Sequence, residues 1–381
     1  MKILFITHTY GMGGANHSLL QLMKELKENY DVEPTLLVSK GVHPYPISDK
    51  CREVGIECIE ARYYWFKYKG YTISNILRVL LDFLLFYPIV IWKLRGRKFD
   101  IIHSNGSVID LGAYLHIFKK IPHVWHLREF GKEDFGVYSL LGKKYEKWIY
   151  SKGDVFIAIS DCIKRAYLDV IPGRKIQMIY NGIKPSEDSL KADHKNEVPQ
   201  FVLVGVVQEA KNQLEAVKAL KIVVEKGVKM HLNFIGIDQN EYADIVRKYI
   251  TENKLGEYVT FWGPRNDVPQ ILKKMDVGLM LSRNEAFGRV TVEYMMQNLA
   301  VIASDTGANP EIIDNGLNGL LYCYCNTNEL ADNMIEFAVK KNVMCDMAKR
   351  GMQHALETFT SNKNTKQVYN VYTTLLPSSL I

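Results

Sequence analysis

The chain has 381 residues, 47% of them hydrophobic and 24% charged, a composition that excludes a disordered or fibrous protein. Its length exceeds one ordinary hydrophobic core and therefore favours two domains. The net charge is +6 overall, but residues 1–185 alone carry +9, so an anionic partner such as phosphate groups, a membrane surface or nucleic acid is expected for the first half. The sequence contains no recognisable nucleic-acid-binding motif, and we expect no nucleic-acid partner.

An apolar run over residues 2–7 predicts a buried strand at the start of the chain. The run is too short for a signal peptide, and the six cysteines contain neither a Cys-x-x-Cys pair nor a zinc-binding spacing, so a reducing, cytoplasmic setting is expected. Gly13 and Gly14 follow the strand and precede an amphipathic helix. Glycines at such a turn let backbone N–H groups approach an anion, although a purely structural turn explains the same residues equally well.

Strands and helices continue to alternate through the first half, which predicts a doubly wound parallel sheet. The further strands are expected at Thr35–Val38, Asp100–His103, His123–His126, Val155–Ile159 and Ile176–Ile179. In such a sheet the ligand crevice lies beyond the carboxyl ends of the strands. Asn105, His126 and Asn181 stand at or just after such ends, so we expect them near the crevice.

Residues 76–94 form an apolar stretch of nearly the length of a membrane span. Three charged residues interrupt it, namely Arg78, Asp82 and Lys93, and a proline breaks it, which disfavours a spanning helix. The wider segment 61–98 carries eight basic side chains against one acidic one, interleaved with aromatic rings. This pattern suits an interfacial segment on anionic lipid, and the alternative is an ordinary core helix with a basic rim.

The polar stretch 184–200 holds two prolines and charges of both signs, which predicts a linker. A second alternating series follows, with strands expected at Phe201–Gly205, His231–Ile235, Val259–Trp262, Val277–Leu281 and Ala300–Ser304. The chain is therefore expected to form two Rossmann-like α/β domains that face a central cleft.

Two turns of the second half carry residues suited to a nucleotide. The first runs from Gly205 to Asn212 and places Lys211 near a helix start, where an ammonium group can support a diphosphate. An exposed lysine at a helix start is the alternative. The second turn places Glu285 in a loop and Glu293 two helical turns later, so the two carboxylates can accept from sugar and ribose hydroxyls around a phosphate at the helix N-terminus. A helix cap and a solvated helix face explain the same spacing.

Together these segments resemble the retaining GT-B glycosyltransferases of family four, also called glycosyl transferases group 1. Glu285 and Glu293 reproduce that family's E-x7-E motif. Further matching segments are the turn Gly13-Gly14-Ala15, Asp100–His103, Asn181–Ile183, and the runs Thr306–Ile313 and Asn315–Leu321. The resemblance covers nearly the whole chain and is most specific in the second half.

The resemblance implies a role for each matching residue. Lys211 would neutralise the donor diphosphate, Glu285 would bind hydroxyls of the transferred sugar, and Glu293 would hold the ribose. His126 would face the reacting sugar as a catalytic residue, together with Glu285. The remaining donor-binding positions that it implies are Gly13, Gly14, Gly205, Asn212, Ala286, Phe287, Gly288 and Arg289, with Gly263 and Arg265 bordering the nucleobase.

Three positions depart from the family pattern. Val206 stands where many members carry arginine, which removes one cation from the diphosphate site. Arg289 follows Gly288 where many members are apolar, and we hypothesise that it compensates. Ala308 replaces the usual second glycine of its run and tightens that turn.

The implied function is retaining transfer of a hexosyl group from a UDP- or GDP-linked sugar to a saccharide acceptor, expected to be lipid-linked, in bacterial capsule, exopolysaccharide or lipopolysaccharide assembly. Residues 1–185 would bind the acceptor, residues 186–358 would bind the nucleotide-sugar, and residues 359–381 would form a helix that crosses back to the first domain. The alternatives on the same fold are a non-catalytic sugar-nucleotide-binding protein and a sugar-nucleotide epimerase.

No metal or other cofactor is expected, because the sequence has no Asp-x-Asp motif and Lys211 with the helix N-termini would take a metal's role. The protein is expected in the cytoplasm, with peripheral contact to an anionic membrane surface at the inner face of the plasma membrane.

Overall fold

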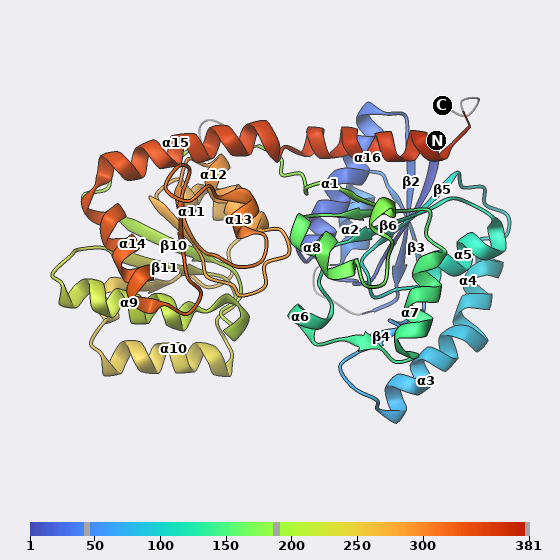
Figure 1. Ribbon diagram of the computed structural model, residues 1–381, viewed down its shortest axis with the longest axis horizontal. Helices are drawn as coiled ribbons and strands as arrows, with labels where there is room; N and C mark the ends of the chain where they lie inside the picture. Colours follow the sequence, from blue (N-terminus) through green and yellow to red (C-terminus); the bar gives the residue numbers. More distant parts are fainter. Residues whose placement is uncertain (42–45, 186–190, 378–381) are drawn as a thin grey trace. The chain divides into compact units, whose positions relative to one another are not determined.

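The computed structural model describes residues 1–41, 46–185 and 191–377 of the chain (Figure 1). It divides into two compact units: Met1–Lys184 together with Ser361–Ile381, and Pro185–Thr360. Each unit has its own parallel sheet flanked by helices. Two Rossmann-like α/β units, as predicted from the sequence, are thereby confirmed.

A seven-stranded parallel sheet forms the centre of the first unit, in the order β3-β2-β1-β5-β6-β8-β9. Its strands are β1 (Lys2–Thr7), β2 (Glu33–Ser39), β3 (Glu57–Ala61), β5 (Ile101–Asn105), β6 (His123–Leu127), β8 (Val155–Ala158) and β9 (Ile176–Met178). A short antiparallel pair, β4 (Lys67–Tyr68) and β7 (Tyr138–Ser139), lies outside this sheet.

The helical elements of the first unit are α1 (Gly14–Asn29), α2 (Ile47–Glu53), α3 (Ile73–Leu81), the π-helical turn η1 (Asp82–Phe86), α4 (Tyr87–Lys93), α5 (Leu111–Lys119), α6 (Lys132–Phe135), α7 (Gly142–Ser151), α8 (Asp161–Tyr167), the 3-10 turn η2 (Gly173–Lys175) and α16 (Ser361–Leu375). The last of these lies beside α1 in Figure 1, and the Thr365 hydroxyl donates to Glu25 Oε2 over 2.8 Å. Strand β1 has a core on each face, because Ile3 and Phe5 pack toward α1 and α16 while Leu4 and Ile6 pack toward α4 and α5.

The second unit has a six-stranded parallel sheet in the order β12-β11-β10-β13-β14-β15. Its strands are β10 (Gln200–Val204), β11 (His231–Ile235), β12 (Val259–Phe261), β13 (Val277–Met280), β14 (Ala300–Ser304) and β15 (Leu320–Tyr322). Its helical elements are η4 (Glu209–Lys211), α9 (Gln213–Glu225), α10 (Glu241–Glu252), η5 (Gly256–Tyr258), α11 (Val268–Leu272), α12 (Arg289–Met296), α13 (Asn309–Ile312), α14 (Thr327–Val339) and α15 (Lys341–Thr358).

Two strands of the large sheets, β3 and β15, were not predicted. Strand β3 reads Glu-Cys-Ile-Glu-Ala, in which two glutamates interrupt the apolar pattern, and β15 spans only Leu320–Tyr322, so neither gives the apolar run that marks the central strands. Strand β6 also continues one residue beyond its predicted end at His126, to Leu127. Residues 186–190 of the predicted linker lie outside the described residues.

Candidate functional site

The loops after β10 and β13 meet at the middle of the second unit's sheet, because these two strands are neighbours. From β10 the chain first builds one edge of the sheet and then crosses to build the other, so the strand order reverses here. Doubly wound sheets bind ligands at such a point, beyond the carboxyl ends of the strands. Lys211 and Glu285 come together there, with Lys211 Nζ 2.9 Å from Glu285 Oε2.

The Glu285 loop is fixed by the turn that follows β14. The Ala308 N–H donates to the Glu285 carbonyl over 2.8 Å. Gly307 has φ +60° and approaches so closely that a Cβ there would lie 2.4 Å from the Glu285 carbonyl oxygen, so only glycine fits. The Glu285 carboxylate also accepts from the Gly288 N–H over 3.3 Å. Glu285 is therefore positioned by the hydrogen bond to its backbone carbonyl and by two groups that donate to its carboxylate, the Lys211 ammonium and the Gly288 N–H.

Helix α12 begins directly after this loop. Gly288 is its N-cap and has φ +83°, a conformation that glycine adopts without strain. One turn into the helix, Arg289 Nε lies 2.8 Å from Glu293 Oε1. Desolvation raises the pKa of the Glu293 carboxyl group, and the Arg289 guanidinium opposes that shift. Arg289 therefore helps to keep Glu293 ionised.

Two polar side chains next to Gly288 were not identified from the sequence. Thr291 Oγ1 and Asn309 Oδ1 are buried and have no hydrogen-bond partner among the described residues. They would lie 3.2 and 3.5 Å from a Cβ at Gly288, so both border the start of α12. Asn309 belongs to the motif run 306–313, but that run alone does not indicate which way its side chain turns.

The other predicted donor-binding residues of this unit lie at neighbouring strand ends. Gly205 follows β10, and a Cβ there would lie 3.8 Å from the Lys211 stem. The Gly263 carbonyl accepts from the Gly236 N–H at the end of the adjacent strand over 2.9 Å. Arg265 forms an ion pair with Asp267 at 2.7 Å.

The remaining three predicted donor-binding residues surround the two loops. Asn212 is the N-cap of α9, Ala286 lies in the Glu285 loop, and the buried Phe287 ring packs against Phe359.

In the first unit, Gly13 and Gly14 stand at the start of α1. Gly13 is the N-cap and has no side chain that could cap the helix, and the first turn has no acidic residue. A Cβ at either glycine would meet no atom of the described residues within 4 Å. Within the part of the chain that the structure describes, the N-terminus of this 16-residue helix therefore offers N–H groups without a side-chain cap to an anion.

His126 lies near the end of β6 within a buried polar network. His126 Nδ1 is 3.2 Å from His103 Nε2 and 3.3 Å from Arg128 Nη2. His103 Nδ1 is in turn 2.7 Å from the Tyr372 hydroxyl on α16. Burial, reinforced by the Arg128 charge, holds the pKa of both His103 and His126 well below the usual value, so both rings are neutral.

Asn105 and Asn181, which the sequence placed at strand ends, orient Arg128. Its Nε donates to Asn105 Oδ1, and its Nη1 donates to Asn181 Oδ1 over 2.5 Å. Both amides therefore act on the site through the guanidinium group.

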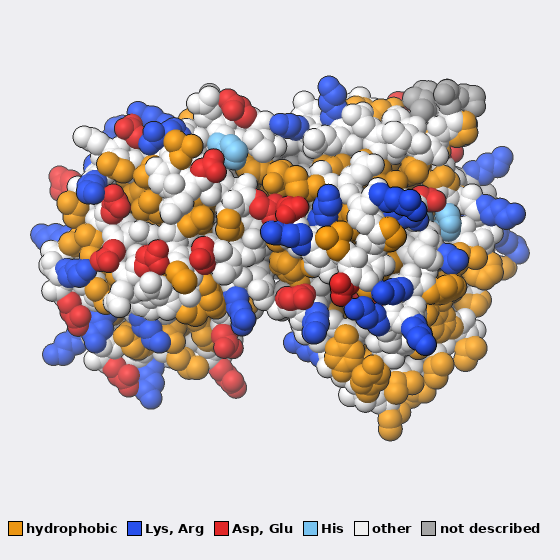
Figure 2. Space-filling model, in the orientation of Figure 1, with side chains coloured by type: hydrophobic (Ala, Val, Ile, Leu, Met, Phe, Trp, Pro, Cys, Tyr) orange, Lys and Arg blue, Asp and Glu red, His pale blue; other side chains and the backbone are white. Residues whose placement is uncertain are grey.

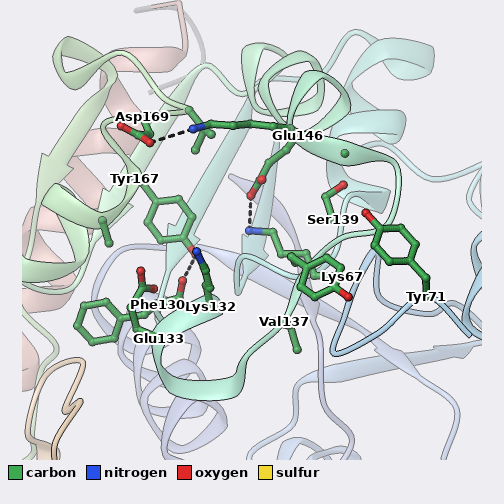
Figure 3. A pocket seen from close by; sticks show the side chains of 15 residues that line it. Lys67, Tyr71, Phe130, Lys132, Glu133, Val137, Ser139, Glu146, Tyr167 and Asp169 are labelled. Atoms are coloured by element: carbon green, nitrogen blue, oxygen red, sulfur yellow. Dashed lines mark hydrogen bonds and ion pairs between the residues drawn. The ribbon is translucent and has the colours of Figure 1, made fainter.

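A cavity of about 550 Å³ opens near the loop after β6 (Figure 3). Figure 3 shows Lys67 and Glu146 pointing toward each other, and their charged atoms are 2.5 Å apart. Tyr71 and Tyr138 lie on the cavity wall with ring centroids 5.3 Å apart. The buried Ser139 Oγ also lines it and has no hydrogen-bond partner among the described residues. Aromatic walls with charged and hydroxyl groups suit a saccharide.

Helix α3, η1 and α4 form one apolar helical segment, Ile73–Lys93, most of which is exposed. It is long and apolar enough to cross a membrane, yet only 22% of its most apolar window is buried, which rules out the alternative of an ordinary core helix. In Figure 2 apolar side chains gather over α3. Nine large apolar side chains of this segment are exposed: Ile73, Ile76, Leu77, Leu80, Leu81, Leu84, Leu85, Ile89 and Trp92. Tyr71, two residues before the segment, is also exposed. We call these ten residues the apolar helical face.

The inner side of the same segment is tied to the fold. The buried Asp82 carboxyl group accepts from the Tyr64 N–H over 3.0 Å, and the Tyr87 hydroxyl donates to Asp110. Cations flank the outer side, where Arg95 lies 4.8 Å from the Trp92 ring centroid.

Among the described residues, no three His, Cys, Asp or Glu side chains are grouped so as to hold a metal ion.

Two family models match the chain. "Glycosyl transferases group 1" matches residues 186–354, and "Glycosyltransferase Family 4" matches residues 12–187. Together they account for both units apart from the ends of the chain.

Three bacterial relatives illustrate the similarity. An N-acetyl-alpha-D-glucosaminyl L-malate synthase of Bacillus anthracis is 28% identical over 58% of this chain and 60% of its own length. The Escherichia coli UDP-Gal:alpha-D-GlcNAc-diphosphoundecaprenol alpha-1,3-galactosyltransferase is 24% identical over 73% of this chain and 76% of its own. An O-antigen biosynthesis glycosyltransferase of Escherichia coli is 25% identical over 98% of this chain and 99% of its own.

Among solved structures, Anabaena HepE in complex with UDP superimposes with a TM-score of 0.81. The match covers 98% of this chain and 100% of that one at 19% identity. A likeness at this level of identity shows a shared fold.

Proposed function

The chain belongs to the glycosyltransferases that these two families describe, and from this premise we propose that it moves a hexosyl group from a nucleotide-sugar to a saccharide acceptor during assembly of a bacterial cell-surface polysaccharide. The observation that carries the proposal is the meeting of Lys211, Glu285 and the Gly288 N–H where the strand order reverses. The O-antigen enzyme that matches nearly the whole chain supports the polysaccharide setting.

The donor would be a UDP- or GDP-linked sugar. Its diphosphate would exchange the Lys211–Glu285 contact for a contact with Lys211, which frees the Glu285 carboxylate to accept from sugar hydroxyls. Glu293 would accept from the ribose, and the N–H groups at the start of α12 would face the phosphates. The open start of α1 at Gly13 and Gly14 suits an anionic group of a substrate in the same way.

We expect transfer with retention of the anomeric configuration. The bond between the anomeric carbon and the diphosphate oxygen breaks, and its electron pair leaves with the nucleoside diphosphate. The acceptor hydroxyl oxygen bonds to the same face of that carbon, and its proton passes to the leaving diphosphate. The residues would act by positioning and by stabilising negative charge on the leaving group, with no metal ion required.

The acceptor would be a lipid-linked saccharide. The cavity beside Ser139 offers the sugar two tyrosine rings and an ion pair between the buried Lys67 and the partly exposed Glu146. Tyr71 belongs both to this cavity and to the apolar helical face, so a sugar in the cavity would lie next to that face. The galactosyltransferase relative, whose acceptor carries a diphosphoundecaprenol, supports this acceptor class.

The apolar helical face would rest in the interface of an anionic membrane on the cytoplasmic side. Aromatic residues such as Trp92 and the neighbouring Arg95 are suited to the headgroup region, and leucines such as Leu84 to the acyl boundary. An interfacial position is favoured over a spanning one, because the bonds of Asp82 and Tyr87 tie the inner side of the segment to the first unit.

Thermal unfolding with a panel of UDP- and GDP-sugars tests the donor proposal. A true donor at about 100 times its dissociation constant should stabilise the chain by about 2.7 kcal/mol. Glu285→Gln should reduce transfer of that sugar by about a hundredfold while the fold persists, because the variant cannot offer a carboxylate to the sugar. Glu336→Gln, which alters a surface ion pair with Lys340, is the matched control and should leave transfer unchanged.

Three outcomes would contradict the proposal. No stabilisation by any nucleotide-sugar argues against a donor site, and equal transfer by Glu285→Gln argues against the assigned residue. Inversion of the anomeric configuration in the NMR spectrum of the product argues against retention. The assay is run with and without EDTA, and a strict need for added manganese would overturn the metal-free expectation.

A further inference from the structure

The buried network around His126 has a single consistent arrangement of protons. Arg128 is the starting point, because a guanidinium group donates hydrogen bonds and never accepts them. Since Arg128 Nη2 contacts His126 Nδ1, that nitrogen must be an acceptor without a proton. A neutral imidazole carries one proton, so the proton of His126 stands on Nε2.

The same reasoning passes to His103 and then to α16. His126 Nδ1 accepts, so His103 Nε2, at 3.2 Å, must be the donor. His103 Nδ1 is then an acceptor, and the Tyr372 hydroxyl at 2.7 Å must donate to it. Arg128 directly, and Tyr372 through His103, thus act jointly to favour one tautomer of His126.

The selected tautomer leaves the N–H group at His126 Nε2 without an acceptor in the described part of the chain. His126 Nε2 is buried and has no hydrogen-bond partner among the described residues. A buried N–H without a partner is costly, so its persistence at this place points to an oxygen atom that a substrate supplies. The neutral ring already holds its proton on this nitrogen and cannot accept another there.

We propose that Tyr372 is a positioning residue that acts through His103 to keep the proton of His126 on Nε2, so that His126 serves the reaction as a hydrogen-bond donor to a substrate oxygen and not as a base. The inference rests on the proposed function and on the place beside the reacting sugar that the family resemblance implies for His126. It also gives the C-terminal helix a part in the chemistry, because α16 carries the hydroxyl group at the far end of the relay.

NMR of histidine-labelled protein tests the relay without any substrate. In the wild type the nitrogen resonances of His126 should show a protonated Nε2 and an unprotonated Nδ1. Tyr372→Phe removes the donor to His103 while it keeps the ring, so that only the 3.3 Å Arg128 contact still favours the proton on His126 Nε2. The variant should therefore shift these resonances toward a mixture of tautomers. Tyr369→Phe is the matched control, because Tyr369 lies on the same helix and packs on Tyr30, and it should leave the His126 resonances unchanged.

Kinetics separate positioning from a purely structural role. Tyr372→Phe should lower kcat by about two- to tenfold with little change in the donor KM, since one hydrogen bond is lost from a group that acts in the transition state. His126→Gln, whose amide N–H replaces the Nε2 donor, should retain more activity than His126→Ala.

Either of two results would overturn the proposal: a proton on Nδ1 of His126 in the wild type, or an unchanged His126 tautomer in Tyr372→Phe. Both are read in the absence of substrate, so they are distinct from a failure of the transferase assignment, which would show as no sugar transfer with a normal His126 tautomer.

Discussion

Lys211 is neutralised by Glu285 in the structure, so its charge becomes available to a diphosphate only when that contact is exchanged. Removing its ammonium group should therefore cost the donor a charge-assisted hydrogen bond while leaving the fold intact. Lys211→Ala is expected to weaken UDP binding by about tenfold or more, measured by titration calorimetry. Lys226→Ala, which removes a surface ion pair with Asp332, is the control and should bind UDP normally. Equal affinities of the two variants would remove Lys211 from the diphosphate site.

Arg289 has a different relation to the nucleotide, because it contacts Glu293. Its charge counteracts the desolvation that raises the pKa of Glu293. Arg289→Ala should let that pKa rise further, so the fraction of ionised Glu293 should fall as the pH is lowered. We expect the variant to bind UDP more weakly than the wild type, with a deficit that grows from pH 8 to about pH 6. A variant that matches the wild type at both pH values would show that Arg289 does not compensate for Val206.

At the scale of elements, the sequence predicted the central strands and the two motif loops, because buried parallel strands are long apolar runs and the loops carry rare residue combinations. It did not predict contacts between residues distant in the chain. The Lys211–Glu285 pair joins residues 74 positions apart, and the Tyr372–His103 bond joins the last helix to β5. Such pairs follow from strand order, which periodicity does not reveal. The sequence predicts the segment 61–98 as interfacial or core, and only the exposure of its helical part, Ile73–Lys93, decides against the core.

The apolar helical face yields a prediction for membrane binding. The wild type should float with vesicles of phosphatidylglycerol at low salt and much less with phosphatidylcholine alone, because both apolar contact and cations contribute. Leu84→Asp combined with Leu77→Asp should reduce the floated fraction by at least about tenfold, since both side chains are more than half exposed on this face. Val339→Asp, at an exposed position of the second unit, is the control.

Two results would count against this surface. The first is an absence of flotation by the wild type at low salt. The second is equal flotation of the double variant and the control. Resistance of the bound protein to alkaline carbonate would instead indicate a spanning segment, and would contradict the interfacial position inferred from the bonds of Asp82 and Tyr87.

At the scale of the whole molecule, the two units are built alike but differ in charge and in buried ionisable groups. Residues 1–185 have a net charge of +9, whereas the whole chain has a net charge of +6, so the remainder of the chain is net acidic. The first unit, which we propose binds the acceptor, is thus the one attracted to anionic surfaces. The first unit also buries groups whose pKa shifts act on stability in opposite directions.

His123 and Asp82 represent these two directions and give the last prediction. Burial lowers the pKa of His123 to about 3, so its contribution is present above the unfolded value of about 6.5 and is lost as the pH falls below it. Burial raises the pKa of Asp82 to about 8, so its contribution is present below the unfolded value of about 3.9 and is lost as the pH rises toward 8. From pH 7 to pH 5.5 the stability of the wild type relative to His123→Asn should therefore fall by about 1 kcal/mol. Relative to Asp82→Asn it should rise by about 1 to 2 kcal/mol. Urea unfolding followed by tryptophan fluorescence measures both differences, and slopes of the same sign for the two variants would refute the assignment.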